Sequence, residues 1–158
     1  MITLAPLSRA ELARVQHLIL PPSQAPFVGT IEEMTADHDA LQDFHIGISD
    51  ETVVAFFKID RAFDRRIPWL PQDAHGLRGL LVGGQYQRQG HGRALLARLS
   101  DYLRRGYPGL GEVFLSVDAG NAVARRAYAN ASWSAMRPRH QGRSGEEVVM
   151  RLPLYTAS

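Results

Sequence analysis

The feature that most constrains the fold of this chain is a glycine-rich turn between an apolar strand and an amphipathic helix. The strand is the mostly apolar run Leu77–Val82, and the turn reads Gln87-Arg88-Gln89-Gly90-His91-Gly92-Arg93. After the turn, apolar side chains recur at helical spacing, at Leu95, Leu96, Leu99, Tyr102 and Leu103. A helix N-terminus offers unpaired N–H groups and the positive end of a dipole, and glycines let a ligand approach the backbone closely. The pattern therefore predicts an anion site suited to a pyrophosphate.

Two widespread nucleotide-binding motifs do not match this turn. No Gly-Lys-Ser/Thr follows the glycines, as a P-loop requires, and Leu95 stands where a dinucleotide fingerprint has its third glycine. An unrelated α/β nucleotide-binding protein with a chance Gly-x-Gly stays open at this point. Such a protein would bind ATP or NAD in place of coenzyme A.

The N-terminal region contains two helix starts. Ser8-Arg9-Ala10-Glu11 is a capping box, and the helix that it opens should end at Pro21-Pro22. The core face of this helix is expected to consist of Leu12, Val15 and Ile19. Thr30-Ile31-Glu32-Glu33 is a second capping box, from which we expect a helix that runs to about Leu41.

Strands are expected on both sides of these helices. Their ranges are Ile2–Ala5, Phe44–Ile48, Thr52–Ile59, Leu77–Val82, Val113–Val117, Trp133–Met136 and Glu147–Leu152. Asn121 should cap a further helix, Ala122–Ala131, and Ala62–Gln72 reads as a loop. The order β-α-α-β-β-β-α-β-α-β-β predicts an α/β fold, a mixed sheet with helices on its faces, in one domain over residues 1–158.

The composition argues against several classes of function. The 158 residues include no cysteine, which excludes disulfides, thiol catalysis and cysteine-based zinc sites, and no metal-ligand spacing is present. The basic residues are scattered and not interleaved with aromatics, so we expect no nucleic-acid partner. No apolar run reaches the roughly 18 residues that span a bilayer, and the N-terminus lacks a secretory signal. We therefore expect a cytoplasmic protein with no membrane contact.

Charge is distributed unevenly along the chain, although the net charge is only +2. Between Arg14 and Lys58 there is no lysine or arginine. The acidic residues of this interval are Glu32, Glu33, Asp37, Asp39, Asp43, Asp50 and Glu51. The interval carries −7, which leaves +9 for the rest of the chain, so one region is suited to a cation and another to an anion. Solvated faces on opposite sides of a domain would explain the same pattern.

Two ordered motifs resemble those of the GNAT superfamily of acetyltransferases. Gln87, Gly90 and Gly92 match the acyl-CoA loop Gln/Arg-x-x-Gly-x-Gly/Ala. The second motif lies one helix and one strand later, at Leu115-Ser116-Val117, Asn121, Ala124, Tyr128 and Ala129-Asn130-Ala131-Ser132-Trp133. The resemblance implies a central, mostly antiparallel sheet of about six to seven strands with helices on both faces. It also implies acetyl transfer from acetyl-CoA, as cosubstrate, to a primary amine.

The resemblance assigns site residues for the coenzyme. Backbone groups of Leu80, Leu81 and Val82 should pair with the pantetheine arm, and one N–H of this strand should polarise the thioester carbonyl. Backbone N–H groups around Arg88–Arg93 should hold the pyrophosphate, with the side chains of Arg88 and Arg93 as auxiliary cations. The coenzyme-binding residues of the turn are thus expected to be Gln87, Arg88, Gln89, Gly90, His91, Gly92 and Arg93. Asn121 is expected either to contact the pantetheine as well as cap its helix or to cap the helix alone.

Tyr128 is the catalytic residue that the resemblance implies, through hydrogen bonding or proton delivery to the departing thiolate. From spacing alone, a core aromatic is the competing interpretation. The general base is not identified, because no glutamate lies within Leu77–Val82. Its candidates are Asp73, His75, Glu112, Asp118 and an ordered chain of water. His45 should either enter the core or face the acceptor.

Three positions depart from the family pattern. Trp133 replaces the usual phenylalanine, an apolar exchange that should keep its role in the core. Ser132 stands where a glycine usually ends the helix in a left-handed conformation, at a cost of about 1 kcal/mol. Arg88 stands where relatives often have glycine.

The acceptor is expected to be a small amine. Pro22-Ser23-Gln24-Ala25-Pro26-Phe27-Val28 resembles a Gln-x-x-Phe-Val segment of bacterial diamine and polyamine acetyltransferases, which favours a polyamine-like molecule. Other small amines, amino acids, aminoglycosides and protein N-termini stay open, as does a homodimer. A non-catalytic acyl-CoA-binding module on the same fold is the competing function.

Overall fold

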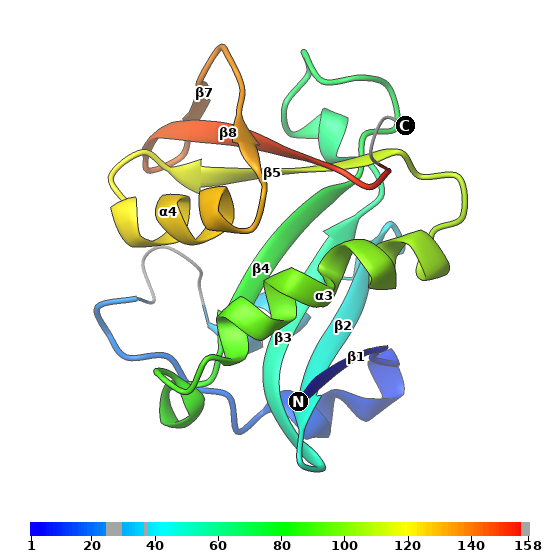
Figure 1. Cartoon of the computed structure of the whole chain (residues 1–158), viewed down its shortest axis with the longest axis vertical. Helices are drawn as coiled ribbons and strands as arrows, with labels where there is room; N and C mark the ends of the chain where they lie inside the picture. The colour runs from blue at the N-terminus through cyan, green and yellow to red at the C-terminus, as the bar shows by residue number, and fades with distance from the viewer. Residues whose placement is uncertain (25–29, 37, 156–158) are drawn as a thin grey trace.

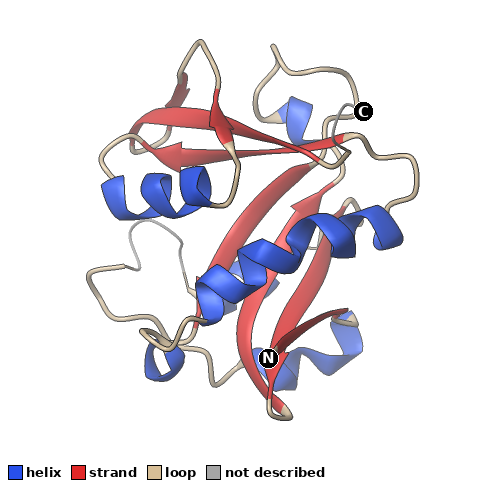
Figure 2. Ribbon diagram, in the orientation of Figure 1, coloured by secondary structure: helices blue, strands red, loops and turns tan. Residues whose placement is uncertain are grey.

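A computed structural model describes residues 1–24, 30–36 and 38–155 of the chain, and its centre is an eight-stranded mixed sheet (Figures 1 and 2). The strands are β1 (Ile2–Pro6), β2 (Gln42–Ser49), β3 (Thr52–Asp60), β4 (Gly76–Val82), β5 (Glu112–Asp118), β6 (Ser134–Ala135), β7 (His140–Gly142) and β8 (Gly145–Pro153). Their order is β1-β2-β3-β4-β5-β8-β6, and β7 also pairs with β8. Among the described strands, the pairing of β4 with β5 is parallel and the other pairings are antiparallel. The expected mixed, mostly antiparallel fold is confirmed.

One strand of the sheet was not expected from the sequence. β7 forms a hairpin with β8, with the register running from His140↔Glu147 to Gly142↔Gly145. Its residues are polar or glycine, so they show none of the apolar alternation that marks a half-buried strand. The pairing with β8 alone reveals it.

The described helices lie on both faces of the sheet. They are η1 (Arg9–Val15), α2 (Ile31–Thr35), η2 (Phe63–Arg65), η3 (Gly84–Tyr86), α3 (His91–Gly106) and α4 (Ala122–Asn130). Figure 1 shows α3 crossing one face of β2, β3 and β4, with η1 behind them. Among the residues described, no helix is long and apolar enough to cross a membrane.

The two N-terminal helices are shorter than predicted. The first is the 3₁₀ helix η1, which ends at Val15, so the helical spacing no longer holds beyond it. Leu18 is buried there, whereas Ile19, the predicted core residue, is 68% exposed. The second helix, α2, ends at Thr35 rather than near Leu41.

Separate apolar clusters fill the two faces. On one face, α3 contributes Leu95, Leu96, Leu99 and Leu103, and Trp133 joins them, as expected of its core role. On the other face, η1 and α2 cover a cluster built on Val15, Leu18, Ile31, Met34, Phe44 and Phe56. The sheet is therefore covered on both faces in the region of β2, β3 and β4, and this fixes the position of the glycine turn that follows β4.

Candidate active site

The strands β4 and β5 meet only at their starts. Their register consists of the pair Gly76↔Phe114, and beyond it the two strands separate (Figure 1). The N–H of Gly83 donates to the carbonyl of Val54 in β3 at 3.0 Å. By the alternation of a strand, the backbone groups of Leu81 also face β3, whereas those of Leu80 and Val82 face the opposite edge. No described strand pairs with that edge, so it is open to a ligand at Leu80 and at the N–H of Val82, whose carbonyl accepts from Gln87, but not at Leu81.

A bulge lies in the middle of β4. The register with β3 steps from Lys58↔Arg78 to Phe56↔Leu81. Gly79 and Leu80 therefore both oppose Phe57, and the extra residue stands outside the ladder. Gly79 has a φ of +63°, and a Cβ there would lie 2.5 Å from Sδ of Met34 in α2. Glycine is needed at this position, because the backbone is left-handed and α2 packs directly over it.

The N-terminus of α3 follows the open edge of β4. Gly90 is its N-cap with a φ of +84°, and no side chain caps the helix. The first helical bond is donated by Ala94 to the carbonyl of Gly90 at 3.0 Å. The N–H groups of His91, Gly92 and Arg93 therefore have no partner within the helix and are available to an anion.

The fold itself does not require glycine at position 92. Its φ is not left-handed, and an added Cβ would lie 3.8 Å from Cγ2 of Val82, which is ordinary van der Waals contact. A side chain would instead extend into the space between α3 and β4. The absence of a side chain keeps this space free for a ligand, and this suits the phosphates of a coenzyme.

A cavity of about 280 Å³ lies where the open edge, the turn and α3 meet. Eight of the residues expected to hold the coenzyme line it: Leu80, Leu81, Val82, Gln87, Arg88, Gly90, His91 and Gly92. Gln89, Arg93, Asn121 and Tyr128 do not line it. Leu20, Gln24 and Tyr86 do, and sequence reasoning missed all three. From the sequence, Gln24 belongs only to the segment that resembles diamine and polyamine acetyltransferases.

The side chain of Gln87 is hydrogen-bonded within the protein. Its Nε2 donates to the carbonyl of Val82 at 2.9 Å and to Oε1 of Gln24 at 2.8 Å. Its own Oε1 accepts from Nε2 of Gln24 at 2.9 Å. Both amide hydrogens are thus committed within the protein, where they hold the start of the turn.

Tyr128 lies on α4 and Asn121 is the N-cap of that helix, on the same face of the sheet as α3. Asn121 accepts a hydrogen bond from the N–H of Ala124 at 3.2 Å, which confirms the cap and leaves its Nδ2 group uncommitted among the described residues. The Tyr128 ring meets that of Trp133 edge to face, with centroids 5.7 Å apart. Burial raises the pKa of Tyr128 to about 12. The phenol therefore stays protonated at neutral pH and has a hydrogen to donate.

Residues 12–132 match the model of the acetyltransferase (GNAT) family. The chain belongs to this family. The expectations of family and of N-acetyltransferase activity are thereby confirmed, whereas the individual site residues stay predictions. A comparison with curated protein sequences found no match.

Solved structures of acetyltransferases share the fold of this GNAT acetyltransferase at low sequence identity. The ribosomal-protein-S18-alanine N-acetyltransferase from Escherichia coli is 23% identical, with a TM-score of 0.67 over 100% of this chain and 97% of the other. The aminoglycoside acetyltransferase AAC(6')-Ib in complex with coenzyme A is 15% identical, with a TM-score of 0.78 over 97% and 95%. The spermidine N-acetyltransferase from Vibrio cholerae, in complex with CoA and spermine, is 15% identical, with a TM-score of 0.69 over 97% and 95%. At such identities the likeness shows the fold alone.

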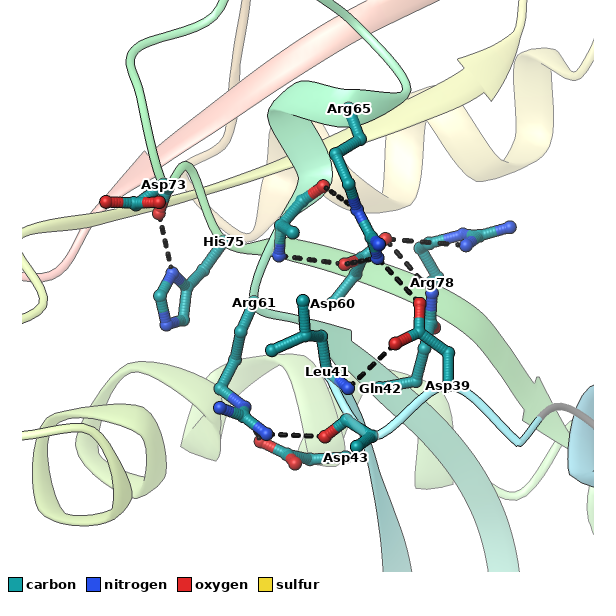
Figure 3. Close-up of polar contacts among 12 residues, drawn as sticks. Asp39, Leu41, Gln42, Asp43, Asp60, Arg61, Arg65, Asp73, His75 and Arg78 are labelled. Carbon is teal, nitrogen blue, oxygen red and sulfur yellow. Dashed lines mark hydrogen bonds and ion pairs between the residues drawn. The ribbon is translucent and has the colours of Figure 1, made fainter.

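The candidate bases of this GNAT acetyltransferase lie at different ends of the opening. Asp73 and His75 directly precede β4, and His75 Nδ1 lies 2.9 Å from the carbonyl of Asp73 (Figure 3). Glu112 begins β5 and pairs with Arg151. All three belong to the end where β4 and β5 meet. Asp118, at the end of β5, is the one candidate beyond the separation of the strands, and its Oδ1 accepts from the N–H of Gly120 at 2.8 Å.

The acidic interval does not form one uncompensated patch. Figure 3 shows Asp39 beside Arg65 and Asp43 beside Arg61, with N–O distances of 2.6 and 3.0 Å. The N–H of Leu41 and the Arg65 guanidinium lower the pKa of Asp39 below its usual value. Two of the seven acidic charges are therefore compensated by arginines from beyond the interval, a pairing that the linear charge count could not reveal.

The remaining acidic residues are dispersed. Asp50 and Glu51 form the turn between β2 and β3, where both have positive φ. Asp37 lies outside the described residues. Glu32 and Glu33 are exposed on α2, the helix that packs over the bulge of β4.

His45 belongs to the core and not to the coenzyme site. It is buried among Phe57, Tyr102 and Tyr107, and burial lowers its pKa to about 4. Beside it a larger cavity of about 650 Å³ opens at the C-terminal end of α3. Of these two cavities, the smaller is the one where, among the described residues, a helix N-terminus and an open strand edge meet.

Proposed function

We propose that this acetyltransferase moves an acetyl group from acetyl-CoA to the primary amine of a small acceptor by direct attack in a ternary complex. The observation that carries the proposal is the open edge of β4 at Leu80 and Val82, directly beside the uncapped N-terminus of α3. A strand edge can pair with the amides of a pantetheine arm, and a helix N-terminus favours a pyrophosphate. Membership of the GNAT family supports the same assignment.

The chain supplies donors at each part of the coenzyme in this proposal. The N–H groups of His91, Gly92 and Arg93 would hold the pyrophosphate, with the exposed side chains of Arg88 and Arg93 beside it and Gln89 contributing backbone only. Leu80 and Val82 would pair with the arm, and the Nδ2 group of Asn121 would reach it from α4. Near the bulge, a backbone N–H would stabilise the negative charge that develops on the thioester oxygen.

The reaction forms a bond from the amine nitrogen to the thioester carbon and breaks the carbon–sulfur bond. An alkylamine with a pKa near 10.4 must first lose a proton, at a cost of about 4.6 kcal/mol at pH 7. Asp118 or ordered water would accept that proton. As the carbon–sulfur bond breaks, the nitrogen would lose its second proton to water and the departing sulfur would receive a hydrogen bond from Tyr128, with the thiolate then taking a proton from water to give free CoA thiol.

The acceptor that we propose is a small cationic amine of the polyamine type, acted on in the cytoplasm by a single domain of residues 1–158. Glu32 and Glu33 support it, because they are exposed on the helix that covers the bulge. Their attraction would weaken with salt, since exposed charges are screened over roughly 8–10 Å at physiological ionic strength. Structural neighbours include enzymes for spermidine, aminoglycosides and a protein alanine.

The test is release of free CoA thiol from acetyl-CoA with a panel of amines. Because the chain contains no cysteine, a thiol reagent gives no background from the protein itself. The panel consists of spermidine, kanamycin, an alanine-terminated peptide and a neutral alkylamine. We expect the fastest release with spermidine. Preference for the neutral amine would contradict the cationic acceptor, and CoA binding without release by any amine would favour a non-catalytic module.

A further inference from the structure

Two chain segments far apart in sequence are docked tightly beside the coenzyme cavity. The N–H of Gly84 donates to the carbonyl of Ile19 at 2.6 Å. A Cβ at Gly83 would lie 2.9 Å from Leu18, and one at Gly84 would lie 2.9 Å from the Ile19 oxygen. The two glycines therefore serve the close approach of segment 17–24 to segment 83–87, rather than flexibility.

The side chains of Gln24 and Gln87 close this contact at the cavity. Each amide donates to the oxygen of the other, at 2.9 and 2.8 Å, and Gln87 also donates to the carbonyl of Val82 at 2.9 Å. The Val82 carbonyl can only accept, so Gln87 must present its nitrogen to it. This fixes the orientation of the Gln87 amide, and with it the orientation of Gln24.

The bond to Val82 connects the pair to the open edge of β4. Val82 contributes its backbone to that edge, and its carbonyl is held by Gln87. Gln87 is also the first residue of the turn that leads to Gly90 and α3. One side chain therefore fixes both the strand edge and the start of the turn, and Gln24 supplies two of its three hydrogen bonds.

We propose that Gln24 is a positioning residue for the coenzyme: it acts through Gln87 to hold the turn and the edge of β4 in the geometry that binds CoA. The inference rests on the proposed function, because it assumes that CoA occupies this cavity. Gln24 itself contacts Gln87 and lines the cavity wall. Its loss should weaken CoA binding by releasing Gln87, without removing a group that the coenzyme needs directly.

The experiment measures the Kd of CoA by titration calorimetry for the wild type, Gln24→Met, Gln87→Met and the double variant. Methionine keeps the size of glutamine and removes its hydrogen bonds. Gln85→Met is the matched control, since Gln85 also joins the two segments, donating to the carbonyl of His17 at 3.2 Å, but does not line the cavity. Thermal unfolding without CoA is recorded for every variant.

We expect Gln24→Met to raise Kd about tenfold and Gln85→Met to change it less than twofold. The double variant should bind CoA within twofold of Gln87→Met alone, because the two residues act as a unit. Gln24→Asn, which keeps the amide but shortens it, provides the same readout if the methionine variant does not fold.

Three outcomes would overturn the inference. These are a wild-type Kd for Gln24→Met, an equal loss in Gln85→Met, or full additivity with Gln87→Met, which would mean that Gln24 touches CoA independently. Failure of the wild type to bind CoA would instead refute the proposed function, so the two failures are distinguishable.

Discussion

The Nε2 atom of His45 lies 3.0 Å from the hydroxyl oxygen of Tyr107. Tyr107 donates to the carboxylate of Asp43 at 2.7 Å, so its oxygen must accept from the His45 Nε2–H. The Nδ1 atom then accepts from the hydroxyl of Tyr102 at 2.5 Å. This directional chain fixes one neutral tautomer of His45 and ties β2 to the C-terminal end of α3.

The first prediction is a loss of stability in mild acid that originates at His45. Burial lowers the pKa of this residue from 6.5 to about 4, so the unfolded chain binds its proton more readily than the folded chain does. The contribution of neutral His45 to the free energy of unfolding is complete above about pH 6.5. It is lost as the pH falls toward 4, and the loss is at most about 3 kcal/mol. Urea unfolding at a series of pH values measures it. His45→Gln should flatten the dependence, whereas exposed His38→Gln should leave it unchanged.

The second prediction concerns Gly92 and binding of the coenzyme. Gly92→Val should keep the fold, because a Cβ finds no closer neighbour than Val82, but the side chain would occupy the space intended for the phosphates. CoA at 100 times its Kd should stabilise the wild type by about 2.7 kcal/mol, and the variant should lose most of that gain. Gly106→Val, at the other end of α3, is the control for thermal-shift measurements. Undiminished binding by the Gly92 variant would mean that the site is misplaced.

A third prediction tests the bulge. Gly79→Ala should destabilise the fold by about 1–2 kcal/mol, because a left-handed φ strains any residue with a Cβ. It should also lower turnover more than it weakens CoA binding, since the bulge is proposed to present the N–H that meets the thioester oxygen. Gly111→Ala is the control, because that glycine has open space and no left-handed φ. Equal turnover in both variants would remove the bulge from the mechanism.

The last prediction concerns Tyr128. With a pKa of about 12, against about 8.5 for a thiol, full proton transfer to the thiolate is uphill by about 5 kcal/mol, so a hydrogen bond is the expected role. Tyr128→Phe should keep CoA affinity and the packing on Trp133 while lowering turnover at least about tenfold, or roughly 1.4 kcal/mol. Single-turnover kinetics isolate the chemical step. An unchanged rate there would make Tyr128 a core aromatic.

The sequence by itself determined the glycine turn, the strand before it and the helix after it. Short-range signals define these elements: the periodicity from Leu95 to Leu103, the cap at Asn121 and the glycines at 90 and 92 all act within a few residues. The left-handed φ of Ser132, +76°, and of Arg88, +64°, agrees with the expectation that glycine is usual at both positions. Local steric rules suffice for such predictions.

Only the tertiary structure decided which backbone and side-chain groups are available. Leu81 lies between Leu80 and Val82, yet β3 occupies its backbone, because pairing depends on a bulge at Gly79 that periodicity does not reveal. Asp39 and Asp43 do not add to an acidic patch. Their charges are compensated by ion pairs with Arg65 and Arg61, which follow β3 in the chain. Gln24 and Gln87 are 63 residues apart, and their pairing depends on the docking of two segments that no local pattern specifies.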